Sequence, residues 1–302
     1  MISTLNKLLI MIVPKLPIVL IKLFSNRYIA GISFEEALNV VEKINNNNMS
    51  ATIDILGEHT STYSEADKIT NDYINLYKLI NKCSLDCNIS LKPSHIGSDL
   101  DIKYFEKNLI KIHNEASNNG NFLRIDMENS LLTQLTINSF NKLYKNNKNI
   151  GIVIQAYLHR SINDIDNLPP NTNIRLCKGI YNESSKVAMK NSAKINKNYI
   201  KLLEKSLERK IYVGIATHDN KLINKALDLI ERKNINSNQF EFQILYGVPM
   251  GNILKQIINK NFKVRVYIPF GDNWYDYSIR RLKENPNIAG YIIKNFFKKN
   301  FY

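Results

Sequence analysis

Cysteine is scarce in this chain of 302 residues, which contains three, at positions 83, 87 and 177. A set this small forms no disulfide framework and favours a reducing compartment, so we expect a cytoplasmic protein. Cys83 and Cys87 have no neighbouring histidine or cysteine to complete a zinc site, and Cys177 lies in an expected strand. We therefore interpret all three as packing residues. Histidines and carboxylates show no clear metal-binding spacing, so no metal is expected.

Long hydrophobic runs are also lacking. Residues 8–13 and 16–21 are apolar, but two prolines and a lysine interrupt them, and neither run approaches the roughly 20 residues of a spanning helix. No small-residue cleavage site follows, so a signal peptide is not expected. A packing helix is the favoured interpretation. A membrane-contacting arm is the alternative, and it would allow peripheral contact with the inner face of the cytoplasmic membrane.

Positive charge is abundant but not concentrated. The net charge is +14, yet the lysines are spread over the whole length among many asparagines. We find no arginine-rich arm, zinc spacing or aromatic-basic RNP-like segment, so nucleic acid is not an expected partner. With 44% apolar and 23% charged residues, the composition is that of a globular protein.

Short runs rich in β-branched residues recur after residue 50, and their starts lie 23–38 residues apart. They are residues 51–57, 88–94, 122–128, 150–157, 173–179, 211–217, 240–247 and 264–269. Helix-like stretches lie between most of them, including residues 64–82 and 184–210. Eight βα repeats predict a (β/α)₈ barrel of the TIM type, an α/β fold.

A doubly wound sheet is the alternative fold, but no G-x-G-x-x-G motif follows any of the strands. We expect an N-terminal helical segment over residues 1–50 and the barrel over residues 51–302. A helix is predicted at 33–46, because Ser33 and Glu36 have the spacing of a capping box.

Polar residues end nearly every predicted strand. They are Glu58, Lys92, Asp126, Glu128, Gln155, Arg175, Lys178, Thr217, His218, Asp219, Tyr246 and Tyr267. Burying so many polar groups is costly unless they pair or hold a ligand, so we expect a polar basin at one mouth of the barrel. Basic groups outnumber carboxylates here, which favours an anionic ligand. No Ser-His-Asp constellation is evident.

The segment 263–284 is the most informative. A strand ends near residue 270 and turns into a helix that carries Tyr277, Arg280, Arg281 and Glu284. Two adjacent guanidinium groups beside a tyrosine are suited to binding a small carboxylate. A solvated basic helix face is the alternative, but the position just beyond a barrel strand favours a binding site.

Seven segments occur in the order found in the proline dehydrogenase family, and together the chain resembles that family over roughly residues 50–290. They are ISLKPS, RIDMENS, IVIQAYL, IRLCKGIYNE, IATHD, EFQILYG and RVYIPFGDNWYDYSIRRLKENPN. The resemblance implies a flavin-binding barrel that uses FAD to oxidise L-proline to Δ1-pyrroline-5-carboxylate. Hydride would pass to flavin N5, and the electrons would then go to a quinone-type acceptor.

The resemblance also implies roles for individual residues. Asp126 and Arg175 would be catalytic, with Arg175 near flavin N5. The proline site would comprise Lys92, Tyr181, Tyr267, Tyr277, Arg280 and Arg281. The FAD site would comprise Met127, Gln155, Arg175, Lys178, Gly179, Ile180, Thr217, His218 and Glu284.

Two other functions remain open at this point. A related flavin barrel could act on another cyclic imino acid such as hydroxyproline, although Tyr267 would crowd a 4-hydroxyl group. A catalytically silent barrel used as a binding module is the other, but the combined presence of Lys92, Asp126, Arg175, Arg280 and Arg281 argues against it.

Overall fold

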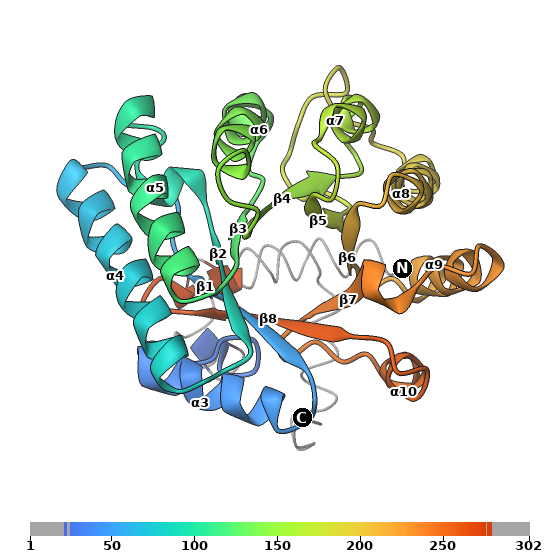
Figure 1. Cartoon of the computed structure of the whole chain (residues 1–302), viewed down its shortest axis with the longest axis horizontal. Helices are drawn as coiled ribbons and strands as arrows, with labels where there is room; N and C mark the ends of the chain where they lie inside the picture. The colour runs from blue at the N-terminus through green and yellow to red at the C-terminus, as the bar shows by residue number, and fades with distance from the viewer. Residues whose placement is uncertain (1–20, 23–24, 276, 280–302) are drawn as a thin grey trace.

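A closed barrel of eight parallel strands forms the centre of the protein, with neighbouring strands in sequence order (Figure 1). The computed structural model describes residues 21–22, 25–275 and 277–279. The strands are β1 (Ser50–Ile55), β2 (Cys87–Leu91), β3 (Leu123–Ile125), β4 (Ile150–Gln155), β5 (Asn173–Cys177), β6 (Tyr212–Ala216), β7 (Phe240–Leu245) and β8 (Val264–Phe270). β1 pairs with β8 in parallel and closes the barrel. The predicted (β/α)₈ barrel is confirmed.

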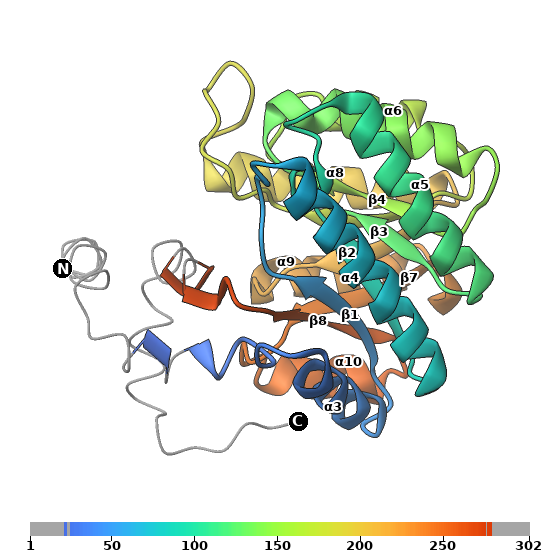
Figure 2. The ribbon, with the colours of Figure 1, turned by 90° about the vertical axis from the view of Figure 1, so that its left-hand side faces the viewer.

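Helices surround the strands on the outside (Figure 1). They are α3 (Phe34–Asn45), α4 (Tyr63–Lys82), α5 (Ile102–Asn118), α6 (Ser130–Tyr144), α7 (Ser161–Asn167), α8 (Ser192–Glu208), α9 (Asn220–Arg232) and α10 (Asn252–Asn259), with 3₁₀ turns η2 (Pro93–Ile96) and η3 (Ser237–Gln239). Figure 2 shows α4 and α5 side by side, and the two pack together. Their buried apolar faces cover the barrel.

Helix α3 precedes the barrel and packs against β1 and β8, where the barrel closes. Its start is fixed by the predicted capping box. The Ser33 hydroxyl accepts a hydrogen bond from the Glu36 amide at 3.2 Å, and the Glu36 carboxylate accepts one from the Ser33 amide at 3.0 Å. These bonds satisfy amide groups that the first helical turn leaves without partners. The predicted helix at 33–46 therefore agrees with the structure within one residue at each end.

The first seven strands end earlier than predicted, whereas β8 ends one residue later, at Phe270. The third strand, expected at 122–128, covers Leu123–Ile125, and the fifth, expected at 173–179, covers Asn173–Cys177. The polar residues that follow leave the sheet and become loops at the mouth of the barrel. The error arises because β propensity continues past the last ladder hydrogen bond.

The helix predicted at 184–210 was wrong over its first eight residues, since α8 begins at Ser192 after its cap, Asn191. Residues 184–191 instead pack against the loop after β4. The amide of Met189 donates to the Tyr157 carbonyl at 2.7 Å, and the amide of His159 donates to the Val187 carbonyl at 3.0 Å. These backbone hydrogen bonds to the loop after β4 replace helical ones, so tertiary contacts override the helix propensity of residues 184–191.

Within the described part of the chain, no helix is both long enough and apolar enough to cross a membrane. The apolar run at 8–13, and all but the last residue of the run at 16–21, lie outside the described residues. The packing helix or membrane-contacting arm predicted there stays a prediction.

Candidate active site

A cavity of about 520 Å³ opens at the carboxyl end of the barrel strands. Every strand contributes to its wall, either from within the strand or from the one or two residues that follow it. In strand order these include Asp54, Lys92, Asp126, Gln155, Arg175, Thr217, Gln243 and Tyr267. Because the carboxyl ends of all eight parallel strands meet here, residues far apart in sequence come together. In barrels of this fold, this end holds the active site.

Most of the residues predicted for the site line this one cavity. They are Lys92, Asp126, Met127, Gln155, Arg175, Lys178, Gly179, Ile180, Tyr181, Thr217, His218, Tyr267 and Tyr277. Arg280, Arg281 and Glu284 lie outside the described residues. Glu58, Glu128 and Tyr246, expected in the polar basin, follow strand ends but do not line this cavity.

Asp126 and Arg175 form the central ion pair of the cavity. The Arg175 Nη1 atom lies 2.6 Å from Asp126 Oδ1, and Ser90 donates to the same carboxylate oxygen at 2.6 Å. The Tyr267 hydroxyl donates to Asp126 Oδ2 at 3.2 Å, while the Arg175 guanidinium lies 4.9 Å from the centre of the Tyr267 ring. The Asp126 side chain is 13% exposed and held from both sides, and it fixes the arginine, so the guanidinium is preorganised.

The opposite face of Arg175 is fixed by Gln243, whose Oε1 accepts from Arg175 Nε at 2.6 Å. Gln243 in turn donates to Glu241 at 2.6 Å, and Glu241 pairs with Arg265 at 2.9 Å. Arg265 then donates to the Ala51 carbonyl at 2.7 Å. This series of hydrogen bonds therefore runs from the cavity down the inside of the barrel and holds Arg175 in place.

Lys92 pairs with a carboxylate that was not predicted, Asp54. The Lys92 ammonium lies 2.8 Å and 2.6 Å from the two Asp54 oxygens, and the Asp54 side chain is 1% exposed. Burial raises the pKa of Asp54, with Lys92 opposing that change. Burial acts to lower the pKa of Lys92, but the carboxylates of Asp54 and Asp126 outweigh it and raise that pKa. Lys92 is therefore held charged beside the cavity.

Lys178 forms the third pair, with Asp219 at 2.7 Å. Asp219 also caps α9, where its Oδ1 accepts from the amides of Lys221 and Leu222 at 3.0 Å and 3.4 Å. Burial acts to raise the pKa of Asp219, but the hydrogen bond and charge of Lys178 outweigh it and the pKa is lowered. The lysine is thereby positioned at the amino end of a helix, an arrangement suited to binding phosphate.

Each described lysine or arginine on the cavity wall is thus paired with its own carboxylate, in the pairs Lys92–Asp54, Arg175–Asp126 and Lys178–Asp219. The expected excess of basic groups is not found in this part of the wall. Surplus positive charge for an anionic ligand would therefore have to come from beyond the described residues, where Arg280 and Arg281 lie.

Gln155 is a wall residue whose hydrogen bonding is incomplete among the described residues. Its Nε2 donates to the Met127 carbonyl at 3.1 Å, and its buried Oε1 has no partner among the described residues. A buried amide oxygen without a donor is costly, so this position fits a ligand that carries an N–H group.

The wall beside Gln155 includes a position at which only glycine fits. Gly179 has φ +101°, and a Cβ there would lie 2.1 Å from the Tyr157 ring. The absent side chain makes room for the Tyr157 ring behind the wall, while the backbone at 178–180 lines the cavity. The unpartnered Gln155 oxygen is the feature of this wall that fits a cofactor with a hydrogen-bond donor at its edge.

Asp54 and Gln243 are the main wall residues that the sequence did not indicate. Both lie inside strands, whereas the prediction covered polar residues at strand ends. The available signal was alternation: Thr52 and Asp54 are two residues apart and alternate with apolar Ala51, Ile53 and Ile55, so they share one face of the strand. Cys177 also lines the cavity, although it was predicted as a packing residue. Burial raises its pKa to about 11, so its thiol is protonated at neutral pH.

Comparison with known proteins gives consistent matches. The family model described as Proline dehydrogenase matches residues 37–292. The chain is 34% identical over 276 residues to Proline dehydrogenase 2 of Bacillus subtilis, covering 91% of both chains. It is 30% identical over 282 residues to the Proline dehydrogenase of Deinococcus radiodurans, covering 91% of this chain and 90% of that protein.

Solved structures of similar fold include proline utilization A from Bdellovibrio bacteriovorus, inactivated by N-propargylglycine. The TM-score is 0.81 at 28% identity, and the match covers 92% of this chain. It covers 34% of the Bdellovibrio chain, so the match corresponds to one part of a longer protein.

Proposed function

The chain belongs to the proline dehydrogenase family, and on this premise we propose that it uses FAD to oxidise L-proline to Δ1-pyrroline-5-carboxylate. The family assignment makes the protein an oxidoreductase of proline catabolism. The proposal goes further in naming the cofactor, hydride transfer to flavin N5 and a quinone-type acceptor. The observation that carries it is the cavity at the mouth of the barrel, whose wall contains thirteen of the sixteen residues that the resemblance implies.

FAD would supply the two-electron acceptor, which no amino-acid side chain provides. Gln155 would hold the ring system through its otherwise unpartnered amide oxygen. Lys178, paired with Asp219 at the start of α9, would lie near the phosphates, where helix amides and a lysine favour negative charge. Met127, Gly179, Ile180, Thr217 and His218 complete the described part of the proposed FAD site.

L-Proline is the proposed substrate, bound between a basic group and tyrosine rings. Lys92 would contribute to binding the carboxylate, with Arg280 and Arg281 as the main contacts. The rings of Tyr181, Tyr267 and Tyr277 would contact the methylenes of the substrate ring. The pairing of Lys92 with Asp54 supports giving the two arginines the larger share, because the lysine charge is already compensated.

The chemical step places modest demands on the protein. Asp126 and Arg175 fix each other, so Arg175 presents a positive charge in a constant position without reorganisation. The tyrosine walls would exclude water and hold the substrate ring in one orientation. The secondary amine of proline must be neutral when the hydride leaves, so low pH should lower the rate.

An anaerobic absorbance spectrum tests this proposal directly. The purified chain should be yellow, and L-proline added without oxygen should bleach the flavin band. A colourless protein, or a flavin that L-proline does not bleach, would contradict the proposal. Bleaching by hydroxyproline at a rate equal to or above that with L-proline would favour the alternative imino-acid substrate.

A further inference from the structure

The loop after β5 forms part of the cavity wall, although it belongs to no strand or helix. Residues 178–181 line the cavity, between the end of β5 at Cys177 and the start of α8 at Ser192. Loops are more mobile than the elements that they connect. Residues 178–181 therefore need attachments on both sides to keep a constant place on the wall.

The attachment on the amino side is made by the loop after β4. The amide of Tyr157 donates to the Lys178 carbonyl at 2.8 Å. Gly179 lies against the ring of the same tyrosine, since a Cβ at this position would lie 2.1 Å from it. These contacts hold the start of the wall segment in place.

The attachment on the carboxyl side is made by Glu183, two residues beyond Tyr181. Its Oε1 accepts a hydrogen bond from the Ser130 amide at 2.6 Å, and its Oε2 accepts one from the Ser130 hydroxyl at 2.6 Å. Ser130 is the first residue of α6, and 53 residues of sequence separate it from Glu183. The free amides and the dipole at the amino end of a helix favour a carboxylate there. Both oxygens of Glu183 are therefore used to bind α6.

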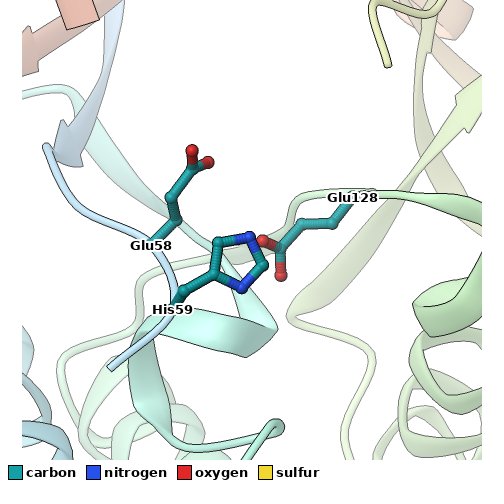
Figure 3. A group of neighbouring side chains, drawn as sticks. All are labelled: Glu58, His59 and Glu128. Atoms are coloured by element: carbon teal, nitrogen blue, oxygen red, sulfur yellow. The ribbon is translucent and has the colours of Figure 1, made fainter. Parts of the chain in front are cut away.

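Ser130 is a firm attachment point because the loop before it is itself fixed. Glu128 is 1% exposed, and its carboxylate accepts hydrogen bonds from Ser94, at 2.8 Å from the amide and 2.5 Å from the hydroxyl. Figure 3 shows the Glu128 side chain pointing from the loop after β3 toward His59, in the loop after β1. The His59 amide donates to the same Ser94 hydroxyl at 3.0 Å. The loops after β1, β2 and β3 are thus joined, and Glu183 connects the loop after β5 to them.

Helix α6 already has a cap from its own sequence. The Asn129 side chain accepts a hydrogen bond from the Leu131 amide at 3.0 Å. A helix with such a cap needs no carboxylate from a distant segment to begin. The two bonds of Glu183 therefore serve the loop that carries it more than the helix that it binds.

We propose that Glu183 is a positioning residue of the active site, which fixes residues 178–181 on the cavity wall by binding the amino end of α6. The inference rests on the proposed function, in which this segment contacts FAD and, through Tyr181, L-proline. Without the attachment the segment would leave its place on the wall, so binding should weaken. The pair of Asp126 and Arg175 is held by other contacts, so kcat should change less than KM.

Ser130→Pro tests the proposal sharply, because it removes both donors to Glu183 and keeps the helix. Proline has no amide hydrogen and no hydroxyl, and it is favoured at the first position of a helix. Asn129, the preceding residue, has φ −65° and ψ 169°, the extended conformation that a following proline requires. Ser130→Pro and Glu183→Ala should each raise the apparent KM for L-proline by about fivefold, the factor typical of one net hydrogen bond. The double variant should be no worse than either single variant.

Hydrogen exchange at the amides of residues 178–184 measures the attachment without substrate. Exchange in the flavin-loaded chain should be faster in both Ser130→Pro and Glu183→Ala than in the wild type. Asn129→Ala is the matched control, because it removes a cap from the same end of α6 but leaves both donors to Glu183. It should lower the melting temperature and leave both exchange at 178–184 and KM unchanged.

Several results would overturn the proposal. Unchanged exchange in the two variants would show that the loop is held without Glu183, and faster exchange with an unchanged KM would show that its position does not affect binding. An equal rise in KM in Asn129→Ala would assign the effect to α6. A wild-type flavin that L-proline does not reduce would instead contradict the proposed function, and exchange at 178–184 would still decide whether Glu183 fixes the loop.

Discussion

Replacing Asp54 by asparagine should destabilise the folded chain by about 3–5 kcal/mol, the cost typical of breaking a buried ion pair. The Asp54 side chain is 1% exposed and its partner Lys92 is 12% exposed, so little water can replace the lost carboxylate. Both carboxylate oxygens contact the ammonium, at 2.8 Å and 2.6 Å, and the amide of asparagine can replace only one of them. The lysine would remain charged inside the barrel without its partner.

Equilibrium unfolding in urea measures this loss, with flavin content checked in parallel. Asp166→Asn is the control, because its pair with Lys205 spans the same 2.6 Å but its carboxylate side chain is 46% exposed. Exposed pairs of this kind contribute about 0–1 kcal/mol. The double variant Asp54→Asn/Lys92→Met removes both charges and should be more stable than Asp54→Asn alone.

The reasoning would be refuted if Asp54→Asn and Asp166→Asn had equal effects. It would also be refuted if the double variant Asp54→Asn/Lys92→Met were less stable than Asp54→Asn alone. Either result would mean that the charge of Lys92 is balanced by another group, so Asp54 would not be what holds it beside the cavity.

Three further outcomes are expected. Denaturing the purified chain should release free FAD, because no histidine or cysteine has a sequence context recognisable as a covalent flavin-attachment site. Flavin that stays with the denatured polypeptide, or a released flavin that is FMN, would contradict this expectation. Arg280→Met and Arg281→Met should each weaken proline binding by about 2–4 kcal/mol, which corresponds to a roughly 30- to 1,000-fold rise in apparent KM. Flavin content should stay near normal. A change in apparent KM under threefold in both variants would mean that the substrate carboxylate is bound elsewhere. Tyr267→Ser should lower kcat/KM for L-proline by the equivalent of about 1–3 kcal/mol and shift the ratio of the two substrates toward trans-4-hydroxy-L-proline. Tyr267→Phe separates this effect from loss of the hydrogen bond to Asp126, and an unchanged ratio in Tyr267→Ser would place Tyr267 outside the substrate pocket.

The barrel could be predicted from the sequence because its signal is repetitive. Eight β-rich segments at regular spacing left few alternatives, and each became a strand. The exact ends could not be predicted, since β propensity in a segment such as 122–128 does not reveal where ladder hydrogen bonds stop. The third strand ends at Ile125, which leaves Asp126 and Glu128 in the loop that forms the mouth.

The sequence predicted which residues form the candidate site better than it predicted which of them form ion pairs. The motifs indicated Lys92, Asp126 and Arg175, but no spacing shows that Lys92 lies against Asp54 and not against Asp126.

The hydrogen-bonded chain from Arg175 through Gln243 and Glu241 to Arg265 restricts how this enzyme can evolve. In an apolar barrel interior, one side chain can be exchanged for another of similar volume without affecting distant positions. Here each member supplies the donor or acceptor of the next, so a single exchange leaves a neighbour unsatisfied. We therefore expect that selection for a new substrate would recover changes among the tyrosines of the wall and the surrounding loops. We expect the hydrogen-bonded side chains inside the barrel to change only when several of them are substituted together.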